Sequence, residues 1–178
     1  MRFLGQSVVE FELVNVIYDN IILKFIGGVI MSQEHISWLR NYLKETYQTP
    51  ILENFLELQV IELEEGKVIY RTKIIDKHCN LYGFVHGGTL ASISDVAMGG
   101  SCITLRKRVV TIDINVSYIK NAPVGSTLTA VGEVISNGNT IMRASGEIFN
   151  EQQQLLVRSQ ASYFVTGDFC ENDYPQSK

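Results

Sequence analysis

Apolar and polar residues follow two different periods along this chain, and these periods predict its helices and strands. Between residues 32 and 47 apolar side chains recur at helical spacing, which is typical of a helix with one buried face, and Pro50 ends that helix. A second helix, rich in small residues, is predicted from about Gly88 to Leu105. Elsewhere apolar and polar residues alternate, which indicates strands. The six predicted strands run at about Phe55–Glu64, Lys67–Ile75, Val109–Lys120, Ser126–Ser136, Thr140–Asn150 and Gln154–Thr166.

The order of these elements predicts an α+β fold. Two strands precede the long helix and four follow it in near-meander order, so we expect a long central helix wrapped by an antiparallel sheet of about six strands. Turn-forming residues separate the strands at Glu65-Gly66, Pro123-Val124-Gly125, Asn137-Gly138-Asn139 and Asn150-Glu151. The predicted boundaries are an N-terminal helix at 31–50, one domain at 51–167 and a polar tail at 168–178.

The first 30 residues are mostly apolar, but charged side chains interrupt them. The segment therefore fits neither a membrane helix, which needs about 20 apolar residues with few charges, nor a secretory signal. The interrupting residues are Glu10, Glu12, Asp19 and Lys24. It could pack on the domain as an extra strand or hairpin. We favour another interpretation, in which residues 1–30 are an extension upstream of a natural start at Met31, because Gly27-Gly28 matches the purine-rich codons of a ribosome-binding site.

Composition narrows the class of protein. Hydrophobic residues make up 46% and charged residues 19% of the chain, which is typical of a globular domain. The net charge of -4 argues against a protein that coats nucleic acid. Cys79, Cys102 and Cys170 form no C-x-x-C pair, and the three histidines are scattered, so we expect no disulfide framework, no metal and no cofactor. This cysteine usage suits the reducing cytoplasm.

Two features of the long helix point to chemistry. Gly87-Gly88 lies at its start, where glycine lets a ligand approach closely and unpaired N–H groups face outwards at the positive end of the helix dipole. Such a donor suits a carbonyl oxygen that gains negative charge. Asp95 lies two turns further on, among small and apolar residues, where a buried carboxylate is costly unless it is paired or has a chemical role. The alternative is an aspartate that simply faces solvent.

The spacing of these two features predicts an oligomer. Gly87 and Asp95 are eight residues apart, which corresponds to about 12 Å along one helix. Attack on a carbonyl requires the reacting atoms to approach within about 3–3.5 Å. If both groups act on one substrate, they must therefore come from two chains, and a dimer follows.

Asn80, the triplet His86-Gly87-Gly88 and Asp95 resemble, in order and spacing, the signature of hot-dog thioesterases of the phenylacetate-degradation (PaaI) type and their mitochondrial relatives. The resemblance covers about Glu53 to Thr166. The segment Thr111–Tyr118 is similar to the strand in which the family places a Ser or Thr near the attacking water. The resemblance implies the hot-dog fold, hydrolysis of acyl-CoA thioesters to free acid and coenzyme A, and a homodimer that pairs into a dimer of dimers.

The resemblance also implies roles for single residues. The Gly87 N–H polarises the thioester carbonyl, with Gly88 beside it in contact with the substrate, and Asp95 of the partner subunit acts as nucleophile or general base. Asn80 and His86 order the loop and the substrate or water, and Thr111 helps to place the water. Simpler interpretations stay open, because His86 could only cap the loop, Asn80 could only form a turn, and Thr111 is a residue type common in strands.

Further residues are candidates for substrate contacts. Arg106-Lys107-Arg108 follows the helix and most simply complements its dipole. The alternative is that this run contacts the phosphates of coenzyme A, together with Lys120 or Arg143. The turn Asn137-Gly138-Asn139 lacks the arginine that often follows the glycine in the family. Residues that could line an acyl pocket, or equally belong to the core, are Tyr82, Phe84, Met98 and Tyr118.

Two other functions are compatible with the same fold. A hot-dog dehydratase or hydratase uses His with Glu or Asp in a different spacing, so the adjacent His86-Gly87-Gly88 favours hydrolysis. A non-catalytic acyl-CoA-binding module usually carries a DNA-binding domain, and the segment Ser32–Tyr47 is too short for one. Such a module would also have no need of Asp95.

Overall fold

The computed structural model of this protein describes residues 32–170. The interpretation of residues 1–30 as an upstream extension before Met31 therefore lies outside the described residues, as does most of the tail at 168–178. The N-terminal helix expected before Pro50 is present and covers residues 32–46. None of the helices in the described range is long and apolar enough to cross a membrane.

The long helix and all six strands are present, with boundaries close to those predicted. The elements after the N-terminal helix are α2 (Leu52–Phe55), β1 (Gln59–Glu64), β2 (Lys67–Lys73), the short 3-10 helix η1 (Asp76–His78), α3 (Gly87–Thr104), β3 (Lys107–Tyr118), β4 (Thr127–Asn137), β5 (Ile141–Phe149) and β6 (Leu155–Asp168). The turn predicted at Glu65-Gly66 joins β1 to β2, and Gly66 has a φ of 76° there, a conformation that favours glycine.

The predicted start of the first strand at Phe55 is wrong. Residues Leu52–Phe55 form the helical turn α2, and β1 begins only at Gln59. Leu56 and Leu58 are both buried and flank an exposed residue, which resembles the alternation of a strand. They lie, however, in the turn between α2 and β1, where Glu57 has a positive φ of 53°. Burial therefore produced a strand-like pattern in a segment that is not extended.

The predicted near-meander order is wrong for one strand. The sheet has the order β1-β2-β4-β5-β6-β3, and all pairs are antiparallel. Strand β3 therefore pairs with β6, not with β4, which follows it in the chain. Because β4 pairs with both β2 and β5, β3 is left at an edge of the sheet, and it takes the edge beside β6. Neighbours in sequence are not always neighbours in a sheet.

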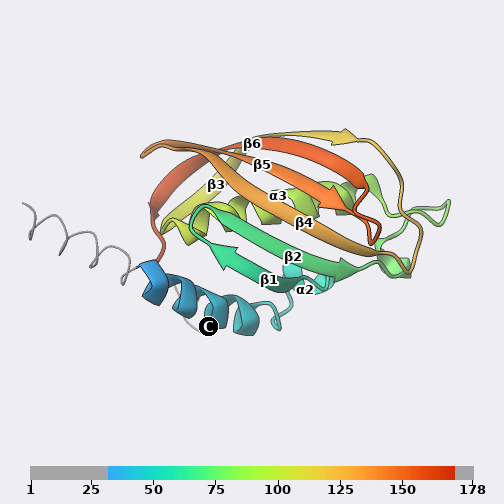
Figure 1. Ribbon diagram of the computed structural model, residues 1–178, viewed down its shortest axis with the longest axis horizontal. Coiled ribbons are helices and arrows are strands. Elements are labelled where there is room, and N and C mark those ends of the chain that lie inside the picture. Colours follow the sequence, from blue (N-terminus) through green and yellow to red (C-terminus); the bar gives the residue numbers. More distant parts are fainter. Residues whose placement is uncertain (1–31, 171–178) are drawn as a thin grey trace, which may run out of the picture. The chain divides into compact units, whose positions relative to one another are not determined.

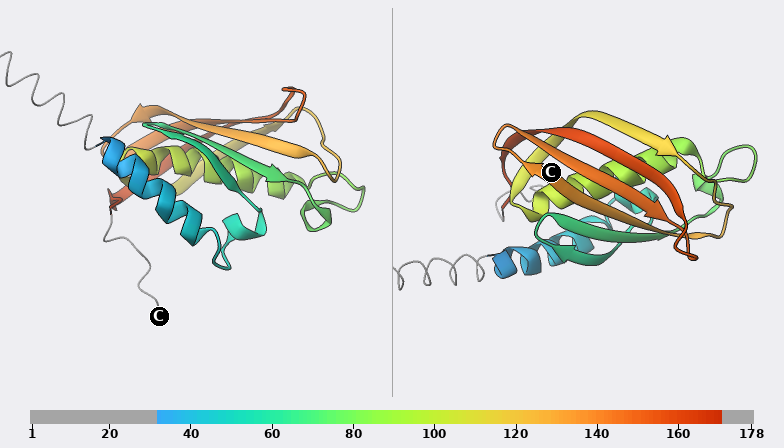
Figure 2. Two further views of the ribbon diagram at one scale, coloured as in Figure 1. Left: turned by 60° about the horizontal axis from the view of Figure 1, so that its bottom comes forward. Right: turned by 45° about the horizontal axis from the view of Figure 1, so that its top comes forward.

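The sheet curves over α3, and the N-terminal helix lies on the same face of the sheet (Figures 1 and 2). Leu39 and Leu43 of that helix share a core with Val68 and Tyr70 of β2 and with Ile93 of α3. A side chain at Gly132 of β4 would clash with the backbone carbonyl of Ala97, so this glycine allows α3 to pack closely against the sheet. This packing fixes α3, and pairing with β6 fixes the edge strand β3; these two elements carry most of the candidate site.

Candidate active site

The start of α3 is closed by a histidine. His86 is the N-cap of the helix, and its Nδ1 accepts a hydrogen bond from the Gly88 N–H at 2.9 Å. Since Nδ1 is an acceptor, the neutral ring carries its proton on Nε2. The Gly88 N–H is thus already satisfied, while the Gly87 N–H has no acceptor among residues 32–170. Of the two glycines predicted to contact substrate, Gly87 is the one that offers a donor.

Asn80 shapes the loop that leads to this helix. Its Oδ1 accepts hydrogen bonds from the backbone N–H groups of Tyr82, at 2.9 Å, and Phe84, at 3.3 Å. This is the turn-forming role that the sequence left open. The loop is exposed, with Tyr82 82% accessible to solvent. A cavity of about 530 Å³ is lined by Cys79, Asn80, Leu81, Tyr82, His86 and Gly87.

Tyr118, the last residue of the edge strand β3, also contacts the start of α3. Together with the loop and Gly87 it forms the first of two half-sites. The hydroxyl of Tyr118 donates a hydrogen bond to the Gly87 carbonyl at 3.0 Å. The same ring lies in van der Waals range of the place that a side chain on Gly87 would occupy. Tyr118 therefore helps to position the first turn of α3, and it is one of the residues that the sequence proposed for substrate contact.

Asp95 is half-buried and held by two hydrogen bonds. Its Oδ1 accepts one from the Thr111 hydroxyl of β3 and one from the Tyr163 hydroxyl of β6, both at 3.0 Å. The Tyr163 hydroxyl also lies 3.1 Å from the backbone carbonyl of Asp95. The sequence placed Thr111 in this site, and the structure brings the two side chains together. An aspartate that simply faces solvent does not fit this arrangement.

Tyr163 is a site residue that the sequence analysis missed. It lies 68 positions after Asp95 and is 2% exposed. Burial raises the pKa of its hydroxyl far above the usual value, and the nearby Asp95 carboxylate raises it further. The hydroxyl therefore stays protonated and remains a donor to Asp95. In the sequence it is one aromatic residue of a strand, with nothing to distinguish it from a core residue.

Asp95 opens into a second cavity, of about 300 Å³, on the face of α3 beside the N-terminal helix. Val96, Gly99, Val109, Thr111 and Tyr163 also line it. None of the residues that line the glycine-loop cavity is among its lining residues. In one chain the Gly87 donor and the Asp95 carboxylate thus face different cavities, as their separation along the helix predicts.

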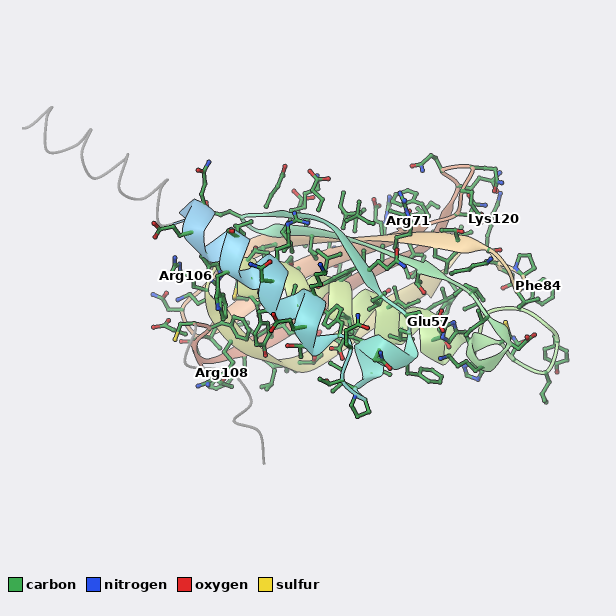
Figure 3. The ribbon with its side chains drawn as sticks, turned by 90° about the horizontal axis from the view of Figure 1, so that it is seen from below. Glu57, Arg71, Phe84, Arg106, Arg108 and Lys120 are labelled. Atoms are coloured by element: carbon green, nitrogen blue, oxygen red, sulfur yellow. The ribbon has the colours of Figure 1, made fainter. Side chains whose placement is uncertain are left out.

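Three residues proposed for substrate contact lie away from both cavities. Met98 is fully buried between α3 and the sheet, where it packs with Met142 and Tyr163, so it belongs to the core. Arg143 lies on β5, whose residues at 142 and 144 are buried against α3, so its exposed side chain is on the outer face of the sheet. Lys120 is exposed just after β3, at the same end of the protein as Phe84 (Figure 3).

The remaining arginines and histidines considered in the sequence analysis line neither cavity. Arg106 and Arg108 lie at the opposite end from Lys120 and Phe84 (Figure 3). In the described part of the chain no group of three His, Cys, Asp or Glu side chains is arranged to hold a metal ion. The histidines outside the loop have structural contacts, because His78 Nε2 lies 2.8 Å from the Phe55 carbonyl and His35 Nε2 lies 2.8 Å from the Ile103 carbonyl.

Known proteins are similar to this chain over most of the domain. Residues 82–157 match the model of the family described as the thioesterase superfamily. The medium/long-chain acyl-CoA thioesterase YigI of Escherichia coli is 29% identical over 126 residues, which cover 62% of this chain and 81% of that protein. The structure of smu.793 from Streptococcus mutans, bound to acetyl-CoA, is 28% identical with a TM-score of 0.64, covering 69% of this chain and 97% of the other.

A third similarity concerns the fold alone. The structure of the PaaI protein from the phenylacetic acid degradation operon of Escherichia coli is 22% identical, with a TM-score of 0.69, and the match covers 76% of this chain and 96% of that one. Together with the long helix on a six-stranded antiparallel sheet, this confirms the predicted hot-dog fold.

Proposed function

We propose that this chain, whose residues 82–157 match the thioesterase superfamily and whose fold is the hot-dog fold, hydrolyses acyl-CoA thioesters to free acid and coenzyme A at sites that two subunits share. Relatives named as acyl-CoA thioesterases and a similar structure with bound acetyl-CoA support the substrate class. The observation that carries the proposal is the pair of half-sites: an unpaired helix N–H at Gly87 and an oriented carboxylate at Asp95, in separate cavities.

Strand β3 offers a way to join the half-sites. It is an edge strand of 12 residues, and its outward groups are available for pairing with a second copy. Val110 and Ile112 are 53% and 52% exposed on it, and their burial would favour association. The opposite edge strand, β1, has only six residues and carries no part of the site.

The register of such a pairing follows from the contacts of two residues. Thr111 of β3 contacts Asp95, and Tyr118 of β3 contacts Gly87. If two β3 strands pair antiparallel about a two-fold axis at Asn115, the β-bulge between Thr111 and Asp113 brings Thr111 of one chain beside the partner's Tyr118. Opposed residues point to the same face of a sheet. The Asp95 half-site of one subunit would then meet the partner's Gly87, twice per dimer.

The proposed chemistry uses one group from each chain. The thioester oxygen accepts a hydrogen bond from the Gly87 N–H and gains negative charge as the carbonyl carbon is attacked. Both hydrogen bonds to Asp95 go to Oδ1, which leaves Oδ2 of the partner's Asp95 to face the reacting carbon or a water molecule. Asp95 then acts as nucleophile or as general base. The C–S bond breaks, the thiol of coenzyme A leaves with a proton, and water supplies the new oxygen of the acid.

Other residues support this arrangement. His86 and Asn80 hold the loop. Lys120 is an exposed cation at the loop end and a candidate contact for the phosphates of coenzyme A. We place the protein in the cytoplasm, because three widely spaced cysteines suit a reducing compartment.

Subunit complementation tests the shared site. Asp95→Asn and Gly87→Pro should each abolish most thiol release from acyl-CoA. Unfolded together and refolded as an equal mixture, they should regain about a quarter of wild-type activity, because half of the dimers are mixed and each mixed dimer has one intact site. A mixture no more active than the two variants alone would show that each subunit works with its own residues or that the function is different.

A further inference from the structure

The cavity beside Asp95 extends from that carboxylate into the space between the N-terminal helix and α3. Tyr42 of the N-terminal helix and Tyr47 just after it, Gly99 and Ile103 of α3, and Glu53 of α2 are among its lining residues. Its volume of about 300 Å³ is at the lower end of the range for ligand pockets. On the proposed function, a thioester carbon near Asp95 would place the acyl group in this space.

The charge of this cavity has one sign. Its lining contains the carboxylates of Glu53 and Asp95 and no Lys, Arg or His. No ion pair or hydrogen bond of the Glu53 carboxylate is found among residues 32–170. Lys77, which lies over the ring of Phe55 at the end of α2, pairs with Glu57 instead, at 3.4 Å. The Glu53 carboxylate therefore has no compensating cation in the cavity.

Hydroxyl groups line the same cavity as Glu53. The Tyr47 hydroxyl is 3.0 Å from that of Tyr70, and both side chains are buried. Burial raises the pKa of Tyr47 well above its usual value, and Tyr70 and the Glu53 carboxylate add to this increase. Thr46, in the same lining, has a buried hydroxyl with no hydrogen-bond partner. An unpaired buried hydroxyl is unfavourable unless a ligand supplies the partner.

We infer that this cavity holds the acyl group, and that Glu53 and Thr46 select short acyl chains that end in a hydroxyl while rejecting chains that end in a carboxylate. A terminal hydroxyl can donate to Glu53 and accept from Thr46, which satisfies both side chains. A terminal carboxylate would be desolvated next to two like charges with no cation to offset them. This inference rests on the proposed thioesterase function.

A matched series of three thioesters tests it: hexanoyl-CoA, ω-hydroxyhexanoyl-CoA and adipoyl-CoA, which differ only at the far end of the acyl chain. For the wild type, kcat/KM for adipoyl-CoA should be at least about tenfold below that for hexanoyl-CoA, and the ω-hydroxy substrate should be the best of the three. Glu53→Gln should raise the ratio of kcat/KM for adipoyl-CoA to that for hexanoyl-CoA about tenfold. Glu53→Lys should make adipoyl-CoA the preferred substrate.

Two more variants separate charge from hydroxyl. Thr46→Val keeps the shape of the side chain and should lower only the preference for ω-hydroxyhexanoyl-CoA. Glu64→Gln, at an exposed glutamate at the end of β1, is the control for lost charge and should behave as wild type. Equal turnover of adipoyl-CoA and hexanoyl-CoA by the wild type, or no change in their ratio in Glu53→Gln, would overturn the inference while hydrolysis stands. Folded wild-type protein that releases thiol from none of the three would overturn the proposed function as well.

Discussion

The two half-sites are built in opposite ways. The glycine loop is exposed, and two of its side-chain contacts join close neighbours, because the Tyr82 N–H donates to Asn80 and the Gly88 N–H donates to His86. Backbone hydrogen bonds from Val85 to Ala122 and from Val124 to Gly83 tie the loop to the segment after β3. Asp95 is half-buried and is held by Thr111 and Tyr163, which lie 16 and 68 positions away. Asn80 and His86, which shape the first half, therefore come from the local sequence, whereas the side chains that hold Asp95 come from distant strands of the sheet. A reaction that needs both half-sites would use the glycine loop of one subunit together with Asp95 of its partner.

The acid half should show the largest loss of activity. Asp95→Asn keeps the size of the side chain and both hydrogen bonds to Oδ1, but it removes the base or nucleophile. We expect kcat to fall by about a thousandfold, with the oligomeric state and thermal unfolding unchanged. Thiol release under saturating acyl-CoA measures the loss. Turnover close to wild type in the folded variant would remove Asp95 from the mechanism and leave the comparison without its second half.

The loop half offers a cleaner substitution, because position 87 already suits proline. Gly87 is the first residue of α3, where the N–H has no helical acceptor, and His86 before it has φ -67° and ψ 139°, which proline tolerates in its predecessor. Gly87→Pro therefore removes the donor and little else of the fold. We expect kcat to fall by about 10²–10³-fold, as when one oxyanion donor is lost.

Gly87→Ala is the matched control, since a side chain there would meet the Tyr118 ring at ordinary contact distance. The alanine variant retains the N–H and should keep most of the activity. If Gly87→Ala and Gly87→Pro lose activity equally, space beside the loop matters and the donor does not.

The same contrast explains what could be predicted from the sequence. The helix start at Gly87, its histidine cap and Asp95 belong to one continuous segment, so their order and spacing were enough to find them and to predict two chains per site. Tyr163 could not be found, because its role depends on the register of β6 beside β3 and on the packing of α3 under both. The edge position of β3 was missed for a related reason, since nothing local shows that β4 bypasses it to pair with β2. Long-range pairing decides such contacts.

The hydroxyls around Asp95 should have intermediate effects. Tyr163→Phe and Thr111→Val each remove one hydrogen bond to a carboxylate, so kcat/KM should fall about tenfold in each variant. Their effects should not add, because both act through the same oxygen. Tyr118→Phe, which removes a hydrogen bond in the loop half, is the comparison and should cost only about twofold to threefold, since the loop has other contacts. A larger loss in Tyr118→Phe than in Tyr163→Phe would reverse the ranking of the two halves.

The smallest effect concerns pH and the helix that borders the acid half. His35 Nε2 donates to the Ile103 carbonyl of α3, and burial lowers the pKa of this histidine below its usual value of 6.5. In the folded protein the neutral ring is favoured, whereas the unfolded chain takes up a proton as the pH falls below about 6.5. The stabilisation is therefore present above that pH and is lost as the pH falls towards the lowered pKa.

We expect the melting temperature to fall between about pH 7.5 and about pH 5.5, by about 2–4 °C for each kcal/mol of the free energy of unfolding that is lost. It should fall less in His35→Gln, whose amide can still donate to the Ile103 carbonyl. Hydrogen exchange measured at both pH values would locate the change. Faster exchange at low pH in the N-terminal helix, with the glycine loop unaffected, is the expected result, because the helix packs on α3 beside Asp95 and the loop does not. Equal acceleration in both regions, or the same pH dependence in His35→Gln, would show that the two halves are not as separate as their hydrogen bonds indicate.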